Sequence, residues 1–333
     1  MSETAHPLLI PFASVSSEAA AKYLQDLRLP NLRQLLDTLS LVSSDIGDEE
    51  SFSAPHERAL AAATGLPVTD GYIPWAAELA NSKAHVLGLE NAQTLPWGFI
   101  TLCHGVVGNG NMSMEDPAAL QVSETESRQL LAAMQPYFYE DGLTLHFVSS
   151  LEPSLWLCGG EPLRDVRTAS LDRVLGKDLS EWQPQGLQSG KLRRLQNEMQ
   201  MLLYTHTVND VRNHVKTNTI NSIWLHGTGD LATTGGKVSA NIDTDIHMPR
   251  SLAEAALKED WTAWVKAWEQ LDTTVCADLL KRVQAGEAVV LTLCGERSAL
   301  RYEMRSTNAM ERLKRSFKTV LGVKPAYLLP KTL

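Results

Sequence analysis

Apolar residues recur at spacings of three and four from Leu192 to Leu203, and Arg, Asn, Glu and Gln fill the positions between them. This period is typical of an amphipathic helix. The next apolar run, Ile220–Leu225, is short and contains β-branched and aromatic residues, so it predicts a strand. The strand leads into Gly227-Thr228-Gly229, and the polar segment between helix and strand contains His206, Asn209, Arg212 and His214.

Along the rest of the chain, short apolar runs alternate with helical periodicity, which favours an α/β fold. Strands are predicted at 8–12, within 97–107, and at 143–148, 155–158 and 288–294. Helices are predicted at 31–41, 55–64, 127–134, 251–271, 274–285 and 308–321. The acidic, serine-rich segment 42–53 and the polar segment 231–250 predict loops.

The predicted helix 251–271 carries Trp261, Trp264 and Trp268 on one face. Large aromatic side chains at this spacing form either a packed core or a stripe for a protein partner. Both interpretations stay open at this point.

Composition narrows the class of protein. The 333 residues are enough for one α/β domain over 1–333, with an inserted subregion around 105–190 as an option. A formal net charge of -9 argues against broad nucleic-acid binding. The four cysteines have no CxxC spacing, which argues against a zinc ribbon and favours a reduced, cytoplasmic protein. We expect neither a signal peptide nor a membrane span.

Ligand crevices in open α/β sheets form beyond the carboxyl ends of strands, and glycines there let backbone N–H groups approach an anion. Arg212 is the first anion-binding candidate, because a guanidinium binds phosphates and carboxylates bidentately. Its alternative is an ion pair with an acidic side chain, and the alternative for Asn209 is a helix cap. The full set of ligand-binding candidates is His56, His104, His206, Asn209, Arg212, Asn221, Gly227 and Gly229.

The spacing Asp243-x-Asp245-x-His247 places three metal-ligand types on one side of an extended segment. The alternative is a solvated acidic loop. By contrast, Ser170-Leu171-Asp172-Arg173 is typical of a capped turn with an internal ion pair.

Two segments together resemble a known family. The run His206-Thr207-Val208-Asn209-Asp210-Val211-Arg212, followed by Asn221-Ser222-Ile223-Trp224-Leu225-His226-Gly227-Thr228-Gly229, resembles the HPxNxxR and NxxWxxGxG segment of archaeal-type cofactor-independent phosphoglycerate mutases. These enzymes belong to the alkaline-phosphatase-like superfamily. Most of the chain is similar to a bacterial family of that ancestry, labelled regulatory protein RpfE type. Matching stretches include 29–32, 55–61, 169–174 and 291–297.

The resemblance implies an alkaline-phosphatase-like three-layer sandwich with a mostly parallel central sheet. It also implies a two-metal centre whose first ligand is an Asp after the first strand, but Ile10-Pro11-Phe12-Ala13-Ser14 has no carboxylate. His56-Glu57 stands at the position of the mutase nucleophile. We therefore expect a degenerate, regulatory protein without a cofactor that binds a phosphorylated or carboxylated small molecule or a protein partner. The alternative is an active phosphomutase or phosphohydrolase with Mn or Zn.

Overall fold

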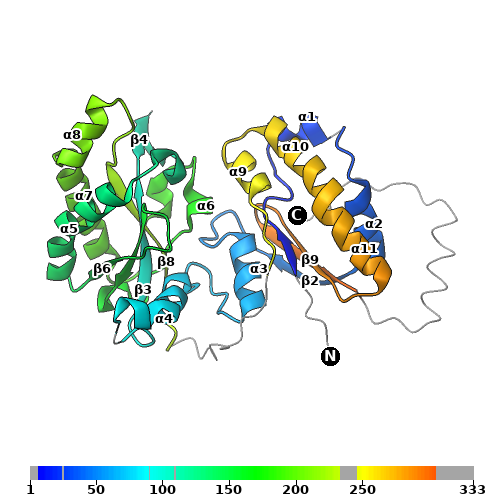
Figure 1. Ribbon diagram of the computed structural model, residues 1–333, viewed down its shortest axis with the longest axis horizontal. Helices are drawn as coiled ribbons and strands as arrows, with labels where there is room; N and C mark the ends of the chain where they lie inside the picture. The colour runs from blue at the N-terminus through cyan, green and yellow to red at the C-terminus, as the bar shows by residue number, and fades with distance from the viewer. Residues whose placement is uncertain (1–6, 25, 90, 109, 233–245, 305–333) are drawn as a thin grey trace. The chain divides into compact units, whose positions relative to one another are not determined.

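The computed structural model describes residues 7–24, 26–89, 91–108, 110–232 and 246–304 (Figure 1). The chain divides into two compact units. Unit 1 comprises residues 1–49, 55–60 and 241–333, and unit 2 comprises residues 50–54 and 61–240. The single domain expected over 1–333 stays a prediction, because this division does not decide whether the two units move as one body.

Unit 2 is built on a four-stranded sheet in the order β6-β7-β3-β8. Every neighbouring pair in this sheet is antiparallel. A separate hairpin, β4-β5, continues the chain after β3. The strands are β3 (Trp97–Cys103), β4 (Gly105–Gly108), β5 (Asn111–Met114), β6 (Thr144–Phe147), β7 (Leu155–Gly159) and β8 (Ser222–Gly229). The helices are α4 (Trp75–Leu87), α5 (Glu124–Glu140), α6 (Leu171–Val174), α7 (Ser189–Tyr204) and α8 (Thr207–His214).

The chain order β3-α5-β6-β7-α7-β8 with this strand order is the split β-α-β arrangement known as ferredoxin-like. Each helical crossover joins two strands that run the same way, but another strand lies between them. The mostly parallel central sheet implied by the family resemblance is therefore wrong. The α/β class itself is confirmed, with antiparallel and mixed sheets.

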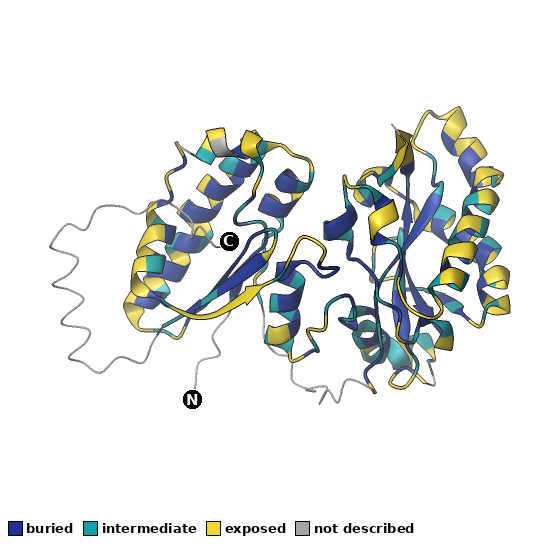
Figure 2. Cartoon of the chain, turned by 180° about the vertical axis from the view of Figure 1, so that it is seen from behind, coloured by how far each residue is buried: buried dark blue, intermediate teal, exposed yellow. Residues whose placement is uncertain are grey.

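The two faces of the unit 2 sheet are covered by different helices. Ile100, Leu102, Ile223 and Leu225 pack with the apolar residues of α5 and α7 in one core. On the opposite face, Trp97 and Phe99 pack with α4, and Cys103 and Trp224 pack with α6. Figure 2 shows the same division, with buried residues on the sheet-facing sides of the helices and exposed residues on their outer sides.

Unit 1 contains a mixed sheet in the order β1-β9-β10-β2, in which only β1 and β9 are parallel. Its strands are β1 (Leu8–Ile10), β2 (Ser40–Ile46), β9 (Val290–Cys294) and β10 (Ser298–Glu303). Its helices are α1 (Glu18–Leu24), α2 (Pro30–Thr38), α9 (Ser251–Leu257), α10 (Trp261–Leu271) and α11 (Ala277–Ala285), and α3 (Pro55–Thr64) begins in this unit. The main core joins α2, α10 and α11 to one face of the sheet.

The tryptophans of α10 belong to that core. Trp264 and Trp268 are fully buried, and Trp261 packs against the same cluster. Their indoles also fix the turn after β1, because Trp264 Nε1 donates to the carbonyl of Phe12 (3.0 Å) and Trp268 Nε1 donates to that of Ala13 (3.2 Å). Phe12 has a φ of 52°, a strained conformation for a bulky residue. Of the two interpretations, the structure supports the packed core.

Two predicted boundaries are wrong. Strand β2 occupies Ser40–Ile46, where a loop was expected from residue 42, because an edge strand needs only backbone pairing to β10 and its side chains here are mostly exposed. The single helix expected over 251–271 is two helices, since Glu259 takes a φ of 53° between α9 and α10. The helix predicted at 308–321 lies outside the described residues.

Asp272 connects the helices of unit 1. Its side chain is almost fully buried, and its carboxylate accepts from the backbone N–H of Leu32 (2.7 Å) and of Asn31 (3.2 Å) in the first turn of α2. The residue before α2, Leu29, makes no side-chain cap. Asp272 therefore supplies the helix cap from a distant part of the sequence.

We expect Asp272→Ala to lower the free energy of unfolding by about 3 kcal/mol, because it leaves two buried N–H groups without an acceptor. Asp260→Ala is the matched control, since Asp260 caps α10 through one exposed bond to Ala263 N (2.9 Å) and its loss should cost about 1 kcal/mol. Urea denaturation followed by tryptophan fluorescence measures both. Equal losses would contradict the bridging role of Asp272.

Candidate functional site

Arg212 is buried and its guanidinium is bound by the protein itself. Nε and Nη2 form a bidentate pair with the Glu126 carboxylate (2.7 and 3.1 Å). Nη1 donates to the carbonyls of Leu120 (3.1 Å) and Asn218 (2.8 Å). Burial alone would raise the pKa of Glu126, but hydrogen bonds from Arg212 and Ser123 outweigh it, and the pKa lies below its ordinary value. This geometry favours the ion-pair interpretation of Arg212.

The side-chain amide of Asn209 joins the end of α7 to the residue Ile220 before β8. Its amide nitrogen donates to the carbonyls of Leu203 (2.8 Å) and Ile220 (2.7 Å), and its amide oxygen accepts from Ile220 N (2.8 Å). Asn221 makes a similar two-way bracket with Gly105, at 2.7 and 2.9 Å. Both amides therefore position the entry into β8.

His104 and His206 also contact the backbone. His104 Nδ1 donates to the carbonyl of Thr219 (2.7 Å), because a carbonyl oxygen only accepts. His206 caps α8 by accepting from Val208 N at its Nδ1 (3.2 Å). We call residues 217–221, which receive bonds from His104, Asn209 and Arg212, the fastened segment.

The glycines are part of the strand rather than a turn after it. Gly227, with a φ of 61°, lies in β8 beside a register shift, and an added Cβ would stand 2.9 Å from the Phe99 ring. At Gly229 the added Cβ would stand 2.8 Å from Pro74. The expected glycine turn is therefore wrong, and close packing explains both residues. Six residues of strand, roughly 20 Å, separate Gly227 from Asn221.

His56 lies in unit 1, where its buried ring packs against Phe12 with centroids 5.8 Å apart. Asp243 and Asp245 lie outside the described residues. His247 is exposed, and its backbone pairs with β1. Within the described part of the chain, no group of three or more His, Cys, Asp or Glu side chains has a geometry that could hold a metal ion.

A different group of polar residues lies in unit 2, between α6 and the segment 51–53. Ser170 Oγ and Trp182 Nε1 are both buried and have no hydrogen-bond partner among the described residues. Ser170 precedes α6, but its side chain makes no cap, so the capped turn expected there is wrong. Leaving a buried donor unpaired costs about 1–3 kcal/mol. Two such groups in one place call for an explanation.

Phe52 contacts both residues, Ser170 through the backbone and Trp182 through the ring. Ser170 N donates to Phe52 O (3.1 Å), and the Phe52 and Trp182 rings are 5.6 Å apart. The Arg173 guanidinium lies 5.6 Å from the Trp182 ring, and its Nε donates to Ser51 O (2.6 Å). Lys177 Nζ lies at the same distance from this ring. We call Ser170 and Trp182 the orphan-donor cluster, and Arg173 and Lys177 lie beside it.

His226 lies on the β8 face next to this cluster. Its Nε2 is hydrogen-bonded to Thr101 Oγ1 (2.8 Å), and its ring packs against Phe99 with centroids 5.4 Å apart. Burial lowers the pKa of His226 to about 4, although the nearby Asp172 carboxylate opposes this shift. The imidazole is therefore neutral at pH 7. Sequence reasoning missed His226, Ser170 and Trp182 as candidates.

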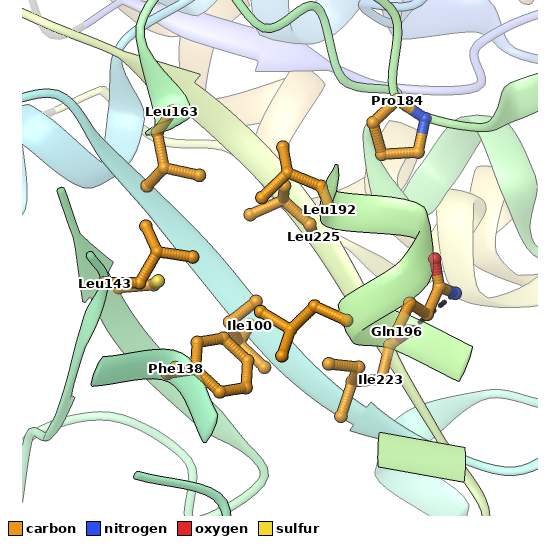
Figure 3. Close-up of a pocket in the computed structure, with 11 residues that line it drawn as sticks. Ile100, Phe138, Leu143, Leu163, Pro184, Leu192, Gln196, Ile223 and Leu225 are labelled. Atoms are coloured by element: carbon orange, nitrogen blue, oxygen red, sulfur yellow. Dashed lines mark hydrogen bonds between the residues drawn. The ribbon is translucent and has the colours of Figure 1, made fainter. Parts of the chain in front are cut away.

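Unit 2 also contains a small cavity between α7 and the sheet (Figure 3). Its volume is about 20 Å³, room for about one water molecule. The only polar side chain among its lining residues is Gln196, whose amide donates to Ile223 O (3.0 Å). An apolar space of this size has no groups to recognise an anion.

The described helices include none that is both long and apolar enough to cross a membrane. The four cysteines are buried and free, and burial raises the pKa of each thiol.

No family model and no curated protein matches the sequence. Among solved structures, the chain is similar to a cofactor-independent phosphoglycerate mutase from Thermoplasma acidophilum, with 12% identity and a TM-score of 0.35 over 92% of this chain and 91% of that chain. It is also similar to the PH0037 protein from Pyrococcus horikoshii, with 12% identity and a TM-score of 0.45 over 90% of this chain and 87% of that chain. Both are distant similarities of shape.

We expect Arg212→Ala to lower the free energy of unfolding by about 3 kcal/mol, because it leaves Glu126 and two carbonyls without their donor. Arg194→Ala is the control, since Arg194 pairs with Asp141 and Glu198 at the surface and should change stability little. Denaturation midpoints compare the two variants.

The same pair makes stability depend on acid. The folded pKa of Glu126 is below the unfolded one, so its contribution is full above about pH 4.3 and falls as the pH drops through the folded pKa. Arg212→Ala should weaken this acid dependence. An unchanged acid profile with unchanged stability would show that the pair holds nothing in place.

Proposed function

We propose that this chain acts by binding a small molecule that carries a phosphate or a carboxylate, at the orphan-donor cluster. One observation supports the proposal above the others: Ser170 Oγ and Trp182 Nε1 are buried and without acceptors among the described residues, and both residues contact Phe52. An anionic oxygen is the acceptor that two such donors lack.

The local charge is consistent with that ligand. Two cations, Arg173 and Lys177, lie at the Trp182 ring. A buried water would also satisfy the two donors. Binding experiments with simple acids separate these two occupants.

The predicted candidates around the fastened segment serve this function less well. The side chains of Arg212, Asn209 and Asn221 are already hydrogen-bonded to Glu126 or to the backbone. An anion there would have to replace existing hydrogen bonds, with no net gain. Ser170 Oγ and Trp182 Nε1 give up no hydrogen bond within the described residues when an acceptor enters.

We also retain the proposal that the chain is a degenerate, regulatory relative of the phosphoglycerate mutases with an altered three-layer architecture. The support is the sequence resemblance together with the end of β1. There Pro11, Phe12 and Ala13 offer no carboxylate, and indoles bind the two carbonyls. The described residues do not fit a two-metal centre, so no catalytic step is assigned.

Inorganic phosphate, acetate and 3-phosphoglycerate test the binding proposal in thermal-shift and calorimetric titrations. We expect at least one acid to raise the melting temperature, since a ligand of the native state stabilises it. Trp182→Phe and Ser170→Ala should each remove this rise. Without ligand, Trp182→Phe should not destabilise the protein, because it deletes an unpaired donor.

Trp156→Phe is the control for these variants. Trp156 Nε1 donates to Ser127 Oγ (2.8 Å), so its loss should cost about 1–2 kcal/mol but leave the ligand response intact. If no acid changes the melting temperature, or if Trp182→Phe binds as the unmodified protein does, the cluster holds an internal water only and the proposal falls.

Elemental analysis of the purified protein tests the expectation that it has no resident metal. We expect less than stoichiometric Mn and Zn, and no phosphatase activity towards 3-phosphoglycerate with either metal added. Stoichiometric metal with turnover would favour the phosphomutase or phosphohydrolase alternative.

A further inference from the structure

Trp224 connects the orphan-donor cluster with His226. Trp224 and His226 project from the same face of β8, because they are two residues apart on one strand. Trp224 Nε1 donates to the carbonyl of Ala169 (3.1 Å), which fixes the residue before Ser170 against this face. The Asp172 carboxylate, in the first turn of α6, acts against the lowering of the His226 pKa.

The surface around His226 combines ring faces with hydrogen-bonding groups. His226 and Phe99 are partly exposed and in ring contact. Trp75, also partly exposed, packs over the neighbouring Gly227, where an added Cβ would stand 3.5 Å from Trp75 Cβ. Within the described residues, hydrogen bonding of the imidazole involves Nε2 alone, so Nδ1 is available to a ligand.

These groups match the chemistry of a sugar ring. A sugar has C–H faces that pack on aromatic rings and hydroxyls that both donate and accept. A neutral imidazole exchanges hydrogen bonds with hydroxyls without placing a second charge in the site. A plain inorganic anion would use none of these groups.

We infer that the acidic ligand is a monosaccharide that carries a phosphate or a carboxylate. Its acid group lies at the orphan-donor cluster, and its hydroxyls contact His226 Nδ1. This inference rests on the proposed function, because it assigns the rest of a ligand whose acid group is placed there.

The experiment compares inorganic phosphate, 3-phosphoglycerate and a panel of hexose phosphates, pentose phosphates and hexuronates by calorimetric titration. At least one sugar acid should bind about tenfold or more tightly than inorganic phosphate, the gain expected from one added hydrogen bond. His226→Gln should remove that gain, since its amide replaces Nε2 towards Thr101 and leaves Nδ1 without a substitute. His226→Asn, which replaces Nδ1, should keep part of the gain.

His146→Gln is the matched control. His146 Nε2 is also hydrogen-bonded to a threonine hydroxyl, that of Thr144 (3.2 Å), and its ring packs against Trp97 at 5.6 Å. It lies on β6, three strands from β8 and roughly 14 Å away. This variant should therefore bind every probe as the unmodified protein does.

The outcomes separate the two claims. Binding of inorganic phosphate with no tighter binding of any sugar acid, or with equal effects of the two His→Gln variants, overturns the sugar assignment and leaves the proposed function standing. Equal or tighter binding of 3-phosphoglycerate that His226→Gln does not change also overturns it. No response to any acid overturns both.

Discussion

The ion pair between Arg212 and Glu126 determines how unit 2 is assembled. Through the same guanidinium, α8 is joined to α5, to the carbonyl of Leu120 and to the fastened segment. The fastened segment then enters β8, the strand that carries Trp224, His226 and Gly227. A buried charge needs every donor paired, so this arrangement has one favourable geometry and fixes the register in which β8 begins.

That constraint explains why the polar segment between α7 and β8 has a structural role. Residues 217–221 have no regular secondary structure, and their backbone groups must still find partners. His104, Asn209 and Arg212 supply them from side chains. A segment can therefore resemble a ligand-binding motif because its polar side chains bond backbone groups of the same chain. In this chain, binding a ligand and bonding the backbone would require the same side-chain atoms.

The sequence predicts where the elements are better than how they are connected. The period at 192–203 and the run at 220–225 correspond to α7 and β8, and the tryptophan stripe of α10 is core. The mostly parallel sheet implied by the resemblance is wrong, because a helix between two strands indicates that they run the same way but not that they are neighbours. In unit 2, β7 lies between β3 and β6, and β3 lies between β7 and β8. The edge strand β2 was missed because an exposed strand needs no apolar pattern.

The proposed site was beyond sequence reasoning for a related reason. The sequence around Ser170 and Trp182 does not distinguish them from Ser127 and Trp156. Those two residues are also buried, and they are hydrogen-bonded to each other. The difference is in what surrounds each donor in the folded chain. Where a buried polar side chain has a partner inside the protein, the hydrogen bond compensates for its desolvation. Where two buried donors beside the buried Arg173 find none, the fold bears a penalty that a ligand can remove. Function is therefore better sought where buried hydrogen bonding is incomplete than where polar residues are dense.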